Sequence, residues 1–471
     1  MFPLKTFKYK SLQDLTIYLF ILLIGVATIC LTTSQLTKIT AGTFPLFLIF
    51  ILYLIENPSS VLVLFFLLTP LIPPVVLHQN SLTPAEILAI PAFALCLLSL
   101  LTGNKKAASE ILYKNKHIFI SMLIFSFFCF LSSIALLNSK NLIPNITSLV
   151  LKPIFIALIL LVFICRFKKN ISIDIIIISI LISSFLLGIF CLYTLMALKP
   201  AWAIDTENLR ISGTFLIFNH LSAYEVLIFF FLLGLYLNSN NIYFKVFLIL
   251  AIGLSIIAQL ASLTLGGILG IIGGILFLIL INENKLRNFA ILILLSIIIS
   301  IGVYFLYPPI ISKFSIISER IIDRIIANYT GLVMIKRYFW FGAGSELGEI
   351  IQSHPNLLYT PFGSGWCVPH NLFITTFATT GIFSFLSLLY LLIAIIIRLK
   401  DIYPKIKVSK NRNFYISLLA GIIAFFLQSM SNNIFWHIIL GSYMFLFIGF
   451  WLKFDEEGDF AFPFFKYTGV K

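Results

Sequence analysis

The sequence predicts an all-α integral membrane protein, a polytopic bundle of about 12–14 transmembrane helices. Of its 471 residues, 60% are hydrophobic and only 11% are charged, and the mean hydropathy is +1.07. Several apolar runs reach the roughly 20 residues that a bilayer-spanning helix needs. A soluble protein of this length does not bury so much apolar surface, so the whole chain, 1–471, is expected to form one membrane domain.

The basic residues predict the orientation of these helices. Lys and Arg gather in short loops between apolar runs, around Lys114, at 166–170 and at 398–412. Such loops lie on the cytoplasmic side of membrane proteins. The net charge of +14 is therefore explained by topology and does not indicate a nucleic acid partner. Both termini are expected in the cytoplasm.

With these loops inside, the expected spans follow in order, and the first is interpreted as a retained helix rather than a signal peptide. A re-entrant segment within 244–281 would change the count and reverse everything after it. Pro70, Pro73 and Pro74 in the third span require accommodation by neighbouring helices. The spans are 14–32, 38–55, 59–77, 86–102, 117–137, 148–165, 172–197, 214–237, 244–260, 262–281, 288–306, 370–397, 413–430 and 434–452.

Sequence motifs for cofactors and disulfides are absent. Five of the six cysteines lie in expected spans, where they are interpreted as small apolar residues, and Cys367 has no evident partner. The sequence has no nucleotide-binding fingerprint, zinc-protease motif or acidic cluster at metal-ligand spacing. No cofactor or metal is therefore expected. No internal repeat is visible, which disfavours inverted-repeat transporters.

Two outward segments are polar enough to carry a function, 199–210 and the long loop 307–369. In the long loop, pairs of Ile recur at 316/317, 321/322 and 325/326, which predicts an amphipathic helix at the membrane–water interface. Arg320 and Arg324 are four residues apart and share one face of it. Pairing of these arginines with their acidic neighbours is the alternative interpretation.

Three stretches, in this order, resemble the O-antigen ligase and polymerase family. "LRISGTFLIFNHLSAY" (209–224) resembles its Arg-x-x-Gly-Thr-Phe…Asn signature, and "RIIANYTGLVMIKRYFWFGAG" (324–344) its loop motif, which ends in a Gly-x-Gly turn. "HNLFITTFATTGI" (370–382) is similar to its His-Asn helix start. The resemblance covers roughly 205–390, and all three stretches fall on the same predicted side of the membrane.

The resemblance implies a fold of the kind known as GT-C-like and a glycosyltransferase of a bacterial inner membrane. Such an enzyme moves a glycan from an undecaprenyl-diphosphate carrier to a sugar hydroxyl at the periplasmic face, without a metal and with inversion expected. The acceptor is a lipid A–core sugar for a ligase or another carrier-linked unit for a polymerase. Membrane lipids are the remaining expected partner, and the oligomeric state is left open.

The site residues follow from matching the motifs to this chemistry. Imidazole titrates near neutrality, so His370 is the expected catalytic base. Guanidinium groups bind phosphate and stay charged, so Arg210 and Arg324 are expected to hold the diphosphate, with Arg320, Lys336 and Arg337 as further candidates. The expected supporting residues are Asn371, Asn219, Glu225, Gly342 and Gly344.

Each of these residues has a plainer interpretation. His370 at a helix start is able to bond a loop carbonyl, Arg210 to anchor its span at the interface, and Asn371 to cap a helix. Glu225 falls about three to four turns into its span, where an acid is costly, and is expected to be structural or to pair with a cation. His437 is expected to be structural, and His220 is poorly placed to pair with Glu225.

The chain departs from the family pattern at three positions. Leu265, in "SLTLGG", stands where a family Arg is common, which removes one phosphate-binding cation. Asn328 replaces an expected Trp, and Phe339 an expected Pro. Arg320, Lys336 or Arg337 is expected to compensate for Leu265, or the donor is held differently.

Two alternative functions remain open. A transporter or lipid-linked oligosaccharide flippase would use the outer loop as a gate, but repeat symmetry and charges near mid-membrane would then be expected. Here the charges concentrate on one outward loop, which favours the enzyme. The second alternative is an inactive structural member of a polysaccharide assembly.

Overall fold

The structure is a computed structural model, and it describes a large part of the chain. The described residues are 58–72, 105–135, 146–166, 171–198, 200, 203–205, 210–215, 217–281, 316–344, 359–360, 363–364, 369–432, 434–435 and 437–458. The expected spans 14–32, 38–55, 86–102 and 288–306 lie outside these residues.

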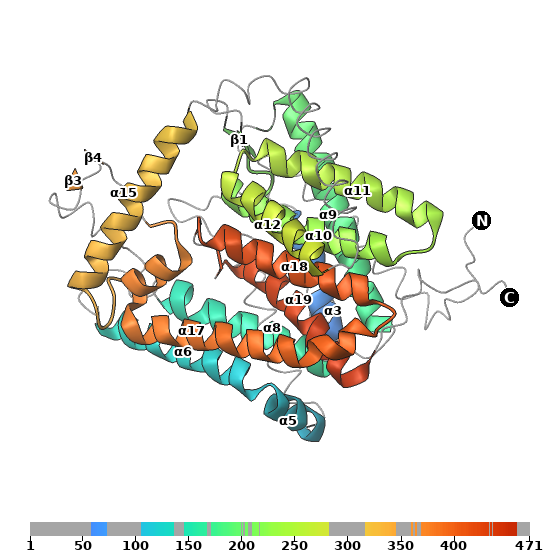
Figure 1. The fold of residues 1–471 in the computed structure, drawn as a ribbon, viewed down its shortest axis with the longest axis horizontal. Coiled ribbons are helices and arrows are strands. Elements are labelled where there is room, and N and C mark those ends of the chain that lie inside the picture. The colour runs from blue at the N-terminus through green and yellow to red at the C-terminus, as the bar shows by residue number, and fades with distance from the viewer. Residues whose placement is uncertain are drawn as a thin grey trace, which may run out of the picture.

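Within the described residues the fold is helical, with two pairs of two-residue strands (Figure 1). The helices are α3 (Pro58–Leu68), α5 (Lys105–Lys114), α6 (Lys116–Ala135), the π-helix η2 (Ile146–Leu151), α8 (Lys152–Arg166), α9 (Ile171–Ala197), α10 (Phe218–Asn238), α11 (Ile242–Ala261), α12 (Leu265–Ile281), α15 (Ile316–Arg337), α17 (Leu372–Lys407), α18 (Arg412–Ser429) and α19 (Ile438–Glu457). The strands are β1 (Ile204–Asp205) with β2 (Arg210–Ile211), and β3 (Tyr359–Thr360) with β4 (Gly363–Ser364).

Seven of the described helices are long and apolar enough to cross a membrane, and two shorter apolar helices accompany them. The seven are α6, α9, α10, α11, α17, α18 and α19, and the shorter ones are α8 and α12. Each of the nine coincides with a span expected from the sequence. The prediction of an all-α polytopic membrane protein is therefore confirmed.

The third expected span, 59–77, is wrong at residues 69–72, and residues 73–77 lie outside the described residues. Helix α3 ends at Leu68, and residues 69–72 form a turn. Pro70 accounts for this end, because proline has no N–H to continue the helix and disfavours helical geometry in the residue before it. The Pro70 carbonyl oxygen instead accepts a hydrogen bond from Thr214 Oγ1.

The core of the bundle is built around α19, which is almost wholly buried. Helix α8 packs parallel to α19, since a Cβ on Gly441 would lie 2.6 Å from Ile156 and one on Gly449 would lie 2.7 Å from Phe163. Helix α10 also runs parallel to α19, with Tyr224 against Tyr443 and Phe231 against Phe447.

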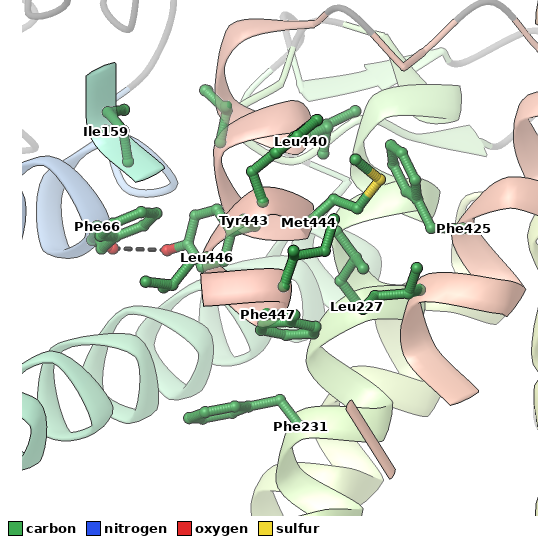
Figure 2. Packing of buried hydrophobic residues seen from close by; sticks show 14 of the residues in the cluster. Phe66, Ile159, Leu227, Phe231, Phe425, Leu440, Tyr443, Met444, Leu446 and Phe447 are labelled. Atoms are coloured by element: carbon green, nitrogen blue, oxygen red, sulfur yellow. Dashed lines mark hydrogen bonds between the residues drawn. The ribbon is translucent and has the colours of Figure 1, made fainter. Parts of the chain in front are cut away.

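Figure 2 shows this packing, in which buried aliphatic and aromatic side chains of several helices surround α19. The Tyr443 hydroxyl donates a 2.6 Å hydrogen bond to the Phe66 carbonyl oxygen (Figure 2). A polar group in such an apolar core needs a partner, and this bond ties α19 to α3.

One end of the bundle is locked by a buried carboxylate, Asp455. It accepts hydrogen bonds from Lys114, Arg398 and Lys405 at 2.5–2.6 Å. These cations come from the ends of α5 and α17, so the C-terminal ends of α17 and α19 lie together. Two of the basic segments predicted to face the cytoplasm, around Lys114 and at 398–412, therefore meet at one end of the bundle.

Helix α17 is broken at Gly381, whose φ of 79° is left-handed. The turn that follows α15 fills the break: Ala343 N donates to the Ala378 carbonyl, Gly344 N to Thr379, and Ile382 N to Phe339, at 2.8–3.0 Å. Figure 1 shows α15 at the edge of the bundle, meeting one end of α17. The backbone groups freed by the break are thus bonded by protein, as a membrane environment requires.

Candidate active site

The site residues lie at the end of the bundle opposite Asp455, where α10, α12, α17 and α19 begin; we call it the site end. Asn371 Nδ2 donates a 3.0 Å hydrogen bond to the Met430 carbonyl, so the start of α17 meets the end of α18. A Cβ on Gly266 would lie 2.1 Å from Ser431 Oγ, so the start of α12 lies there too. Three helix termini thus meet around one short connection.

Arg210 is buried at the site end, with 9% of its surface exposed. Its Nε donates to the Ser262 carbonyl at 3.1 Å, and Nη2 lies 3.4 Å from the Leu263 carbonyl and 3.5 Å from Thr264 Oγ1. The guanidinium carbon lies 3.2 Å above the centre of the Phe218 ring. Arg210 is therefore fixed against the turn between α11 and α12, rather than at a lipid interface.

The local sequence explains this position. Arg210 is in β2, which pairs with β1, and Ser212 N donates to the Ala203 carbonyl. Gly213 then turns the chain into α10 with a φ of 56°, a conformation that favours glycine. A Cβ at Gly213 would also lie 3.2 Å from the sulfur of Cys191. The Arg-x-x-Gly spacing thus delivers the arginine to the turn and starts the helix.

Leu265, which departs from the family pattern, lies directly after the turn that Arg210 contacts. Leu265 is the first residue of α12 and is 38% exposed. The guanidinium of Arg210 contacts residues 262–264, which directly precede it. Arg210, the cation of the 209–224 motif, therefore reaches this segment from β2. Asn219 joins the same cluster, since its Oδ1 accepts from Thr264 Oγ1 at 3.3 Å.

His370 lies at the entrance to α17, on the other side of the Met430 connection. The side chain of Asn371 caps α17 by accepting from Phe373 N at 3.0 Å and Ile374 N at 3.2 Å. Thr375 Oγ1 donates to the Pro369 carbonyl at 2.8 Å. The residues on both sides of His370 are therefore held, while His370 itself is exposed. Asn371 therefore acts as a helix cap, as its alternative interpretation expected, and it also donates a hydrogen bond to the Met430 carbonyl.

Helix α15 packs on this entrance and carries Arg324. A Cβ on Gly331 would lie 2.5 Å from both Pro369 and Ile374, so α15 approaches closely there. Arg324 is seven residues before Gly331 and hence on the same face. Partial burial first, and then the positive charge of Arg324, lower the pKa of His370 below its usual 6.5. The lowered pKa favours the neutral imidazole, which is the form that accepts a proton.

The other expected cations lie along α15 on either side of this contact. Arg320 is one turn before Arg324, and nothing is described of its side chain. Lys336 and Arg337 are exposed in the last turn, and Arg337 lies 5.7 Å from the Tyr338 ring centre. They are 12 and 13 residues beyond Arg324, or about 18 Å along the helix. Among the α15 cations whose side chains are described, Arg324 is the one whose charge acts on His370.

Glu225 lies nearer the start of its helix than predicted, and its hydrogen-bond partner among the described residues is a serine rather than a cation. Helix α10 begins at Phe218, so Glu225 is about two turns in rather than three to four. Its Oε2 accepts a 2.6 Å hydrogen bond from Ser255 Oγ of α11, and the residue is 1% exposed. Glu225 therefore joins α10 to α11 below the site end.

Gly342 and Gly344 form the turn that docks into α17. Both have positive φ, 72° and 84°. A Cβ on Gly342 would lie 2.3 Å from the Thr379 backbone, and one on Gly381 would lie 2.2 Å from the Trp340 carbonyl. The Gly-x-Gly motif thus positions α15, and with it Arg324, rather than contacting the site directly.

Sequence reasoning missed one part of the site, the connection 430–437 between α18 and α19. Its described residues contact Asn371, Gly266 and, through His437, the ring of His220 at 4.1 Å between ring centres. Most of its residues are neutral and it lies beyond the three motifs, so only its position between two short-spaced spans marked it.

Comparison with known families agrees with the geometry. Residues 247–389 match the family model described as O-antigen ligase. The match includes α11, α12, α15 and the first half of α17, and therefore Arg324, His370 and Asn371, whereas Arg210 and the 430–437 connection lie outside it. No curated protein matches the chain. The family match over 247–389 and the polytopic helical fold together support an assignment to the O-antigen ligase and polymerase family.

Proposed function

We propose that the protein transfers a glycan from an undecaprenyl-diphosphate carrier to a sugar hydroxyl at the periplasmic face of a bacterial inner membrane. The family supports a membrane glycosyltransferase of the O-antigen ligase type. The observation that carries the finer proposal is the arrangement at the site end, where an exposed neutral histidine faces the charge of Arg324 and adjoins the turn that holds Arg210.

In the proposed reaction His370 is the general base. The acceptor hydroxyl loses its proton to the imidazole while its oxygen bonds to the anomeric carbon of the donor sugar. The bond from that carbon to the carrier phosphate breaks, and the carrier diphosphate leaves with the electron pair. A single displacement of this kind inverts the anomeric carbon. A lowered pKa keeps the imidazole in the form that accepts the proton.

Arg210 and Arg324 are proposed to stabilise the charge that develops on the leaving diphosphate. Guanidinium groups remain charged at any physiological pH and bind phosphate oxygens in a bidentate manner. Arg210 is already oriented by two backbone carbonyls and the Phe218 ring, so little side-chain entropy is lost when an anion binds. The reaction is proposed to need no metal ion.

The experiment uses purified protein, a lipid-diphosphate donor and a saccharide acceptor. Removal of an oriented cation from the transition state is expected to reduce kcat about 10²–10³-fold, as for other preorganised donors. Arg324→Ala and Arg210→Ala are expected to show this loss, Arg320→Ala much less, and EDTA none. Equal and negligible effects of Arg324→Ala and Arg320→Ala would remove α15 from the site, and abolition by EDTA would refute the metal-free reaction.

Ligase and polymerase differ only in acceptor, and glycan analysis of a deletion strain separates them. Loss of long glycan from lipid A with carrier-linked polymer accumulating indicates a ligase. Single repeat units in place of a ladder indicate a polymerase.

A further inference from the structure

A second group of basic side chains meets at the site end, outside the arrangement described above. The imidazole rings of His220 and His437 lie 4.1 Å apart between centres, inclined by 43°. His220 is in the first turn of α10, and His437 directly precedes α19. His437 is therefore at the helix start rather than within the span, where the sequence placed it as a structural residue.

Lys152 is brought to the same place by the packing of α8 on α19. These helices run parallel, with Ile156 against Gly441 and Phe163 against Gly449. One turn before that first contact lie Lys152 on α8 and His437 before α19. The charge of Lys152 accordingly acts on the rings of both His220 and His437.

The chemistry of this group suits the binding of an anion. His437 Nδ1 is buried and has no hydrogen-bond partner among the described residues. Burial, then His220 and then Lys152, lower the pKa of His437 well below its usual value. The N-termini of α10 and α19 also open here without a side-chain cap, and helix N-termini attract negative charge.

A purely structural role explains these contacts less well. Packing of the two rings alone leaves His437 Nδ1 without a hydrogen-bond partner among the described residues, and the nearby lysine disfavours protonation of either ring. A phosphate oxygen placed among the three groups would instead accept hydrogen bonds from both rings and the ammonium.

We propose that His220, His437 and Lys152 form a binding site for a phosphate group at the site end of the bundle. The phosphate belongs either to the carrier diphosphate or to a phospholipid headgroup. The first source rests on the proposed function, because the connection 430–437 joins this site to the neighbourhood of Arg210 and His370. The second source does not.

Binding of inorganic pyrophosphate and lipid tests the proposal on the full chain, with no turnover required. Affinity for pyrophosphate is measured by calorimetry in a neutral detergent free of phospholipid. Retention of phosphatidylglycerol over phosphatidylcholine is measured by native mass spectrometry from nanodiscs containing both. Lys152→Gln and His437→Gln remove the two groups, Lys152→Arg retains the charge, and Lys400→Gln removes a charge from an exposed residue near the Asp455 end.

Lys152→Gln and His437→Gln are each expected to weaken phosphate binding about tenfold, or about 1.4 kcal/mol, with wild-type affinity in Lys152→Arg and Lys400→Gln. Weakening for pyrophosphate assigns the site to the carrier diphosphate, and weakening confined to phosphatidylglycerol retention assigns it to a headgroup. Unchanged binding of both probes in Lys152→Gln overturns the proposal even if His370→Ala abolishes transfer. Transfer that survives in His370→Ala refutes the proposed base and leaves this site intact.

Discussion

Asn371 performs two tasks with one side chain. Its oxygen caps α17, and its nitrogen bonds the Met430 carbonyl, so the residue beside His370 is tied both to its own helix and to the connection 430–437. The first bond is a general helix-start device. The second couples the position of His370 to the rest of the site end.

Substitution of Asn371 is expected to separate these tasks. Asn371→Ala loses both and is expected to destabilise the protein by about 1 kcal/mol through the cap, with an additional loss of transfer rate. Asn371→Asp retains the cap and loses the donor to Met430, so its melting temperature is expected near wild type while its rate falls. Thermal unfolding and turnover are measured on the same preparations.

Asn241 provides the matched control. It caps α11 with the same two backbone bonds but near the opposite end of the bundle. Asn241→Ala is expected to cost similar stability without a loss of rate. Equal rate losses in Asn241→Ala and Asn371→Ala would show that general destabilisation, rather than the position of His370, controls turnover.

The charge of Arg324 is expected to govern the titration of His370. A nearby cation disfavours the protonated imidazole, so removal of it in Arg324→Ala should raise the His370 pKa toward the usual 6.5, while burial keeps it somewhat below. The protonated, inactive form then persists to higher pH, and the acidic limb of kcat/KM moves upward with it. NMR titration of histidine-labelled protein, which contains six histidines, reads the pKa directly.

Lys400→Ala removes an equal charge from the opposite end and should leave the titration unchanged. If the His370 pKa were the same in wild type and Arg324→Ala, Arg324 would not face His370 as described.

At the scale of elements, the predictable features were those that depend on hydropathy or residue spacing over many positions. Hydropathy located nine of the described helices, and the Ile pairs located α15. The break at Gly381 was not predicted, because its cause is a backbone turn that arrives from elsewhere in the chain. Similarly, the motifs named Arg210, Arg324 and His370, but not residues 430–437, whose contribution is made largely through backbone carbonyls and packing.

The docked turn is expected to depend on its glycines. Gly381→Ala places a Cβ 2.2 Å from the Trp340 carbonyl at a φ of 79°, so the turn must leave the break in α17. Non-glycine residues in such strained conformations cost about 1–3 kcal/mol, and displaced backbone groups add to that. Reduced melting temperature and reduced transfer are both expected, because α15 moves with the turn.

Gly253→Ala is the control, since its Cβ would meet no atom within 4 Å and it lies within helix α11. Alanine is favoured over glycine in a helix by up to about 1 kcal/mol, so this variant should be as stable as wild type or more so. A Gly381→Ala protein with the same melting temperature as Gly253→Ala would argue against the docked turn.

At the scale of the whole molecule, the structure separates the two ends of the bundle chemically. One end gathers Lys114, Arg398 and Lys405 around Asp455, and the other gathers Arg210, Arg324 and His370. The positive-inside rule assigns the first end to the cytoplasm, and the proposed periplasmic reaction requires the second end to face outward. The charge distribution and the proposed reaction therefore predict the same orientation of the bundle in the membrane.

Cysteine labelling tests this orientation. In a cysteine-free background, Met196→Cys, at the exposed end of α9 near the site end, is expected to react with a membrane-impermeant maleimide added to the periplasm of cells with permeabilised outer membranes. Lys410→Cys, between α17 and α18, is expected to react only after the inner membrane is opened. The reverse pattern would place His370 in the cytoplasm and exclude the proposed reaction.

The central claim is that His370 removes the acceptor proton, and the transfer rate of purified His370→Ala tests it most directly. General-base catalysis contributes about 10²–10⁴-fold, so kcat should fall by that factor with donor binding retained. His117→Ala, which removes a histidine bonded to Tyr390 far from the site end, should keep its rate. A His370→Ala enzyme that transfers glycan within a few-fold of wild type would contradict the account.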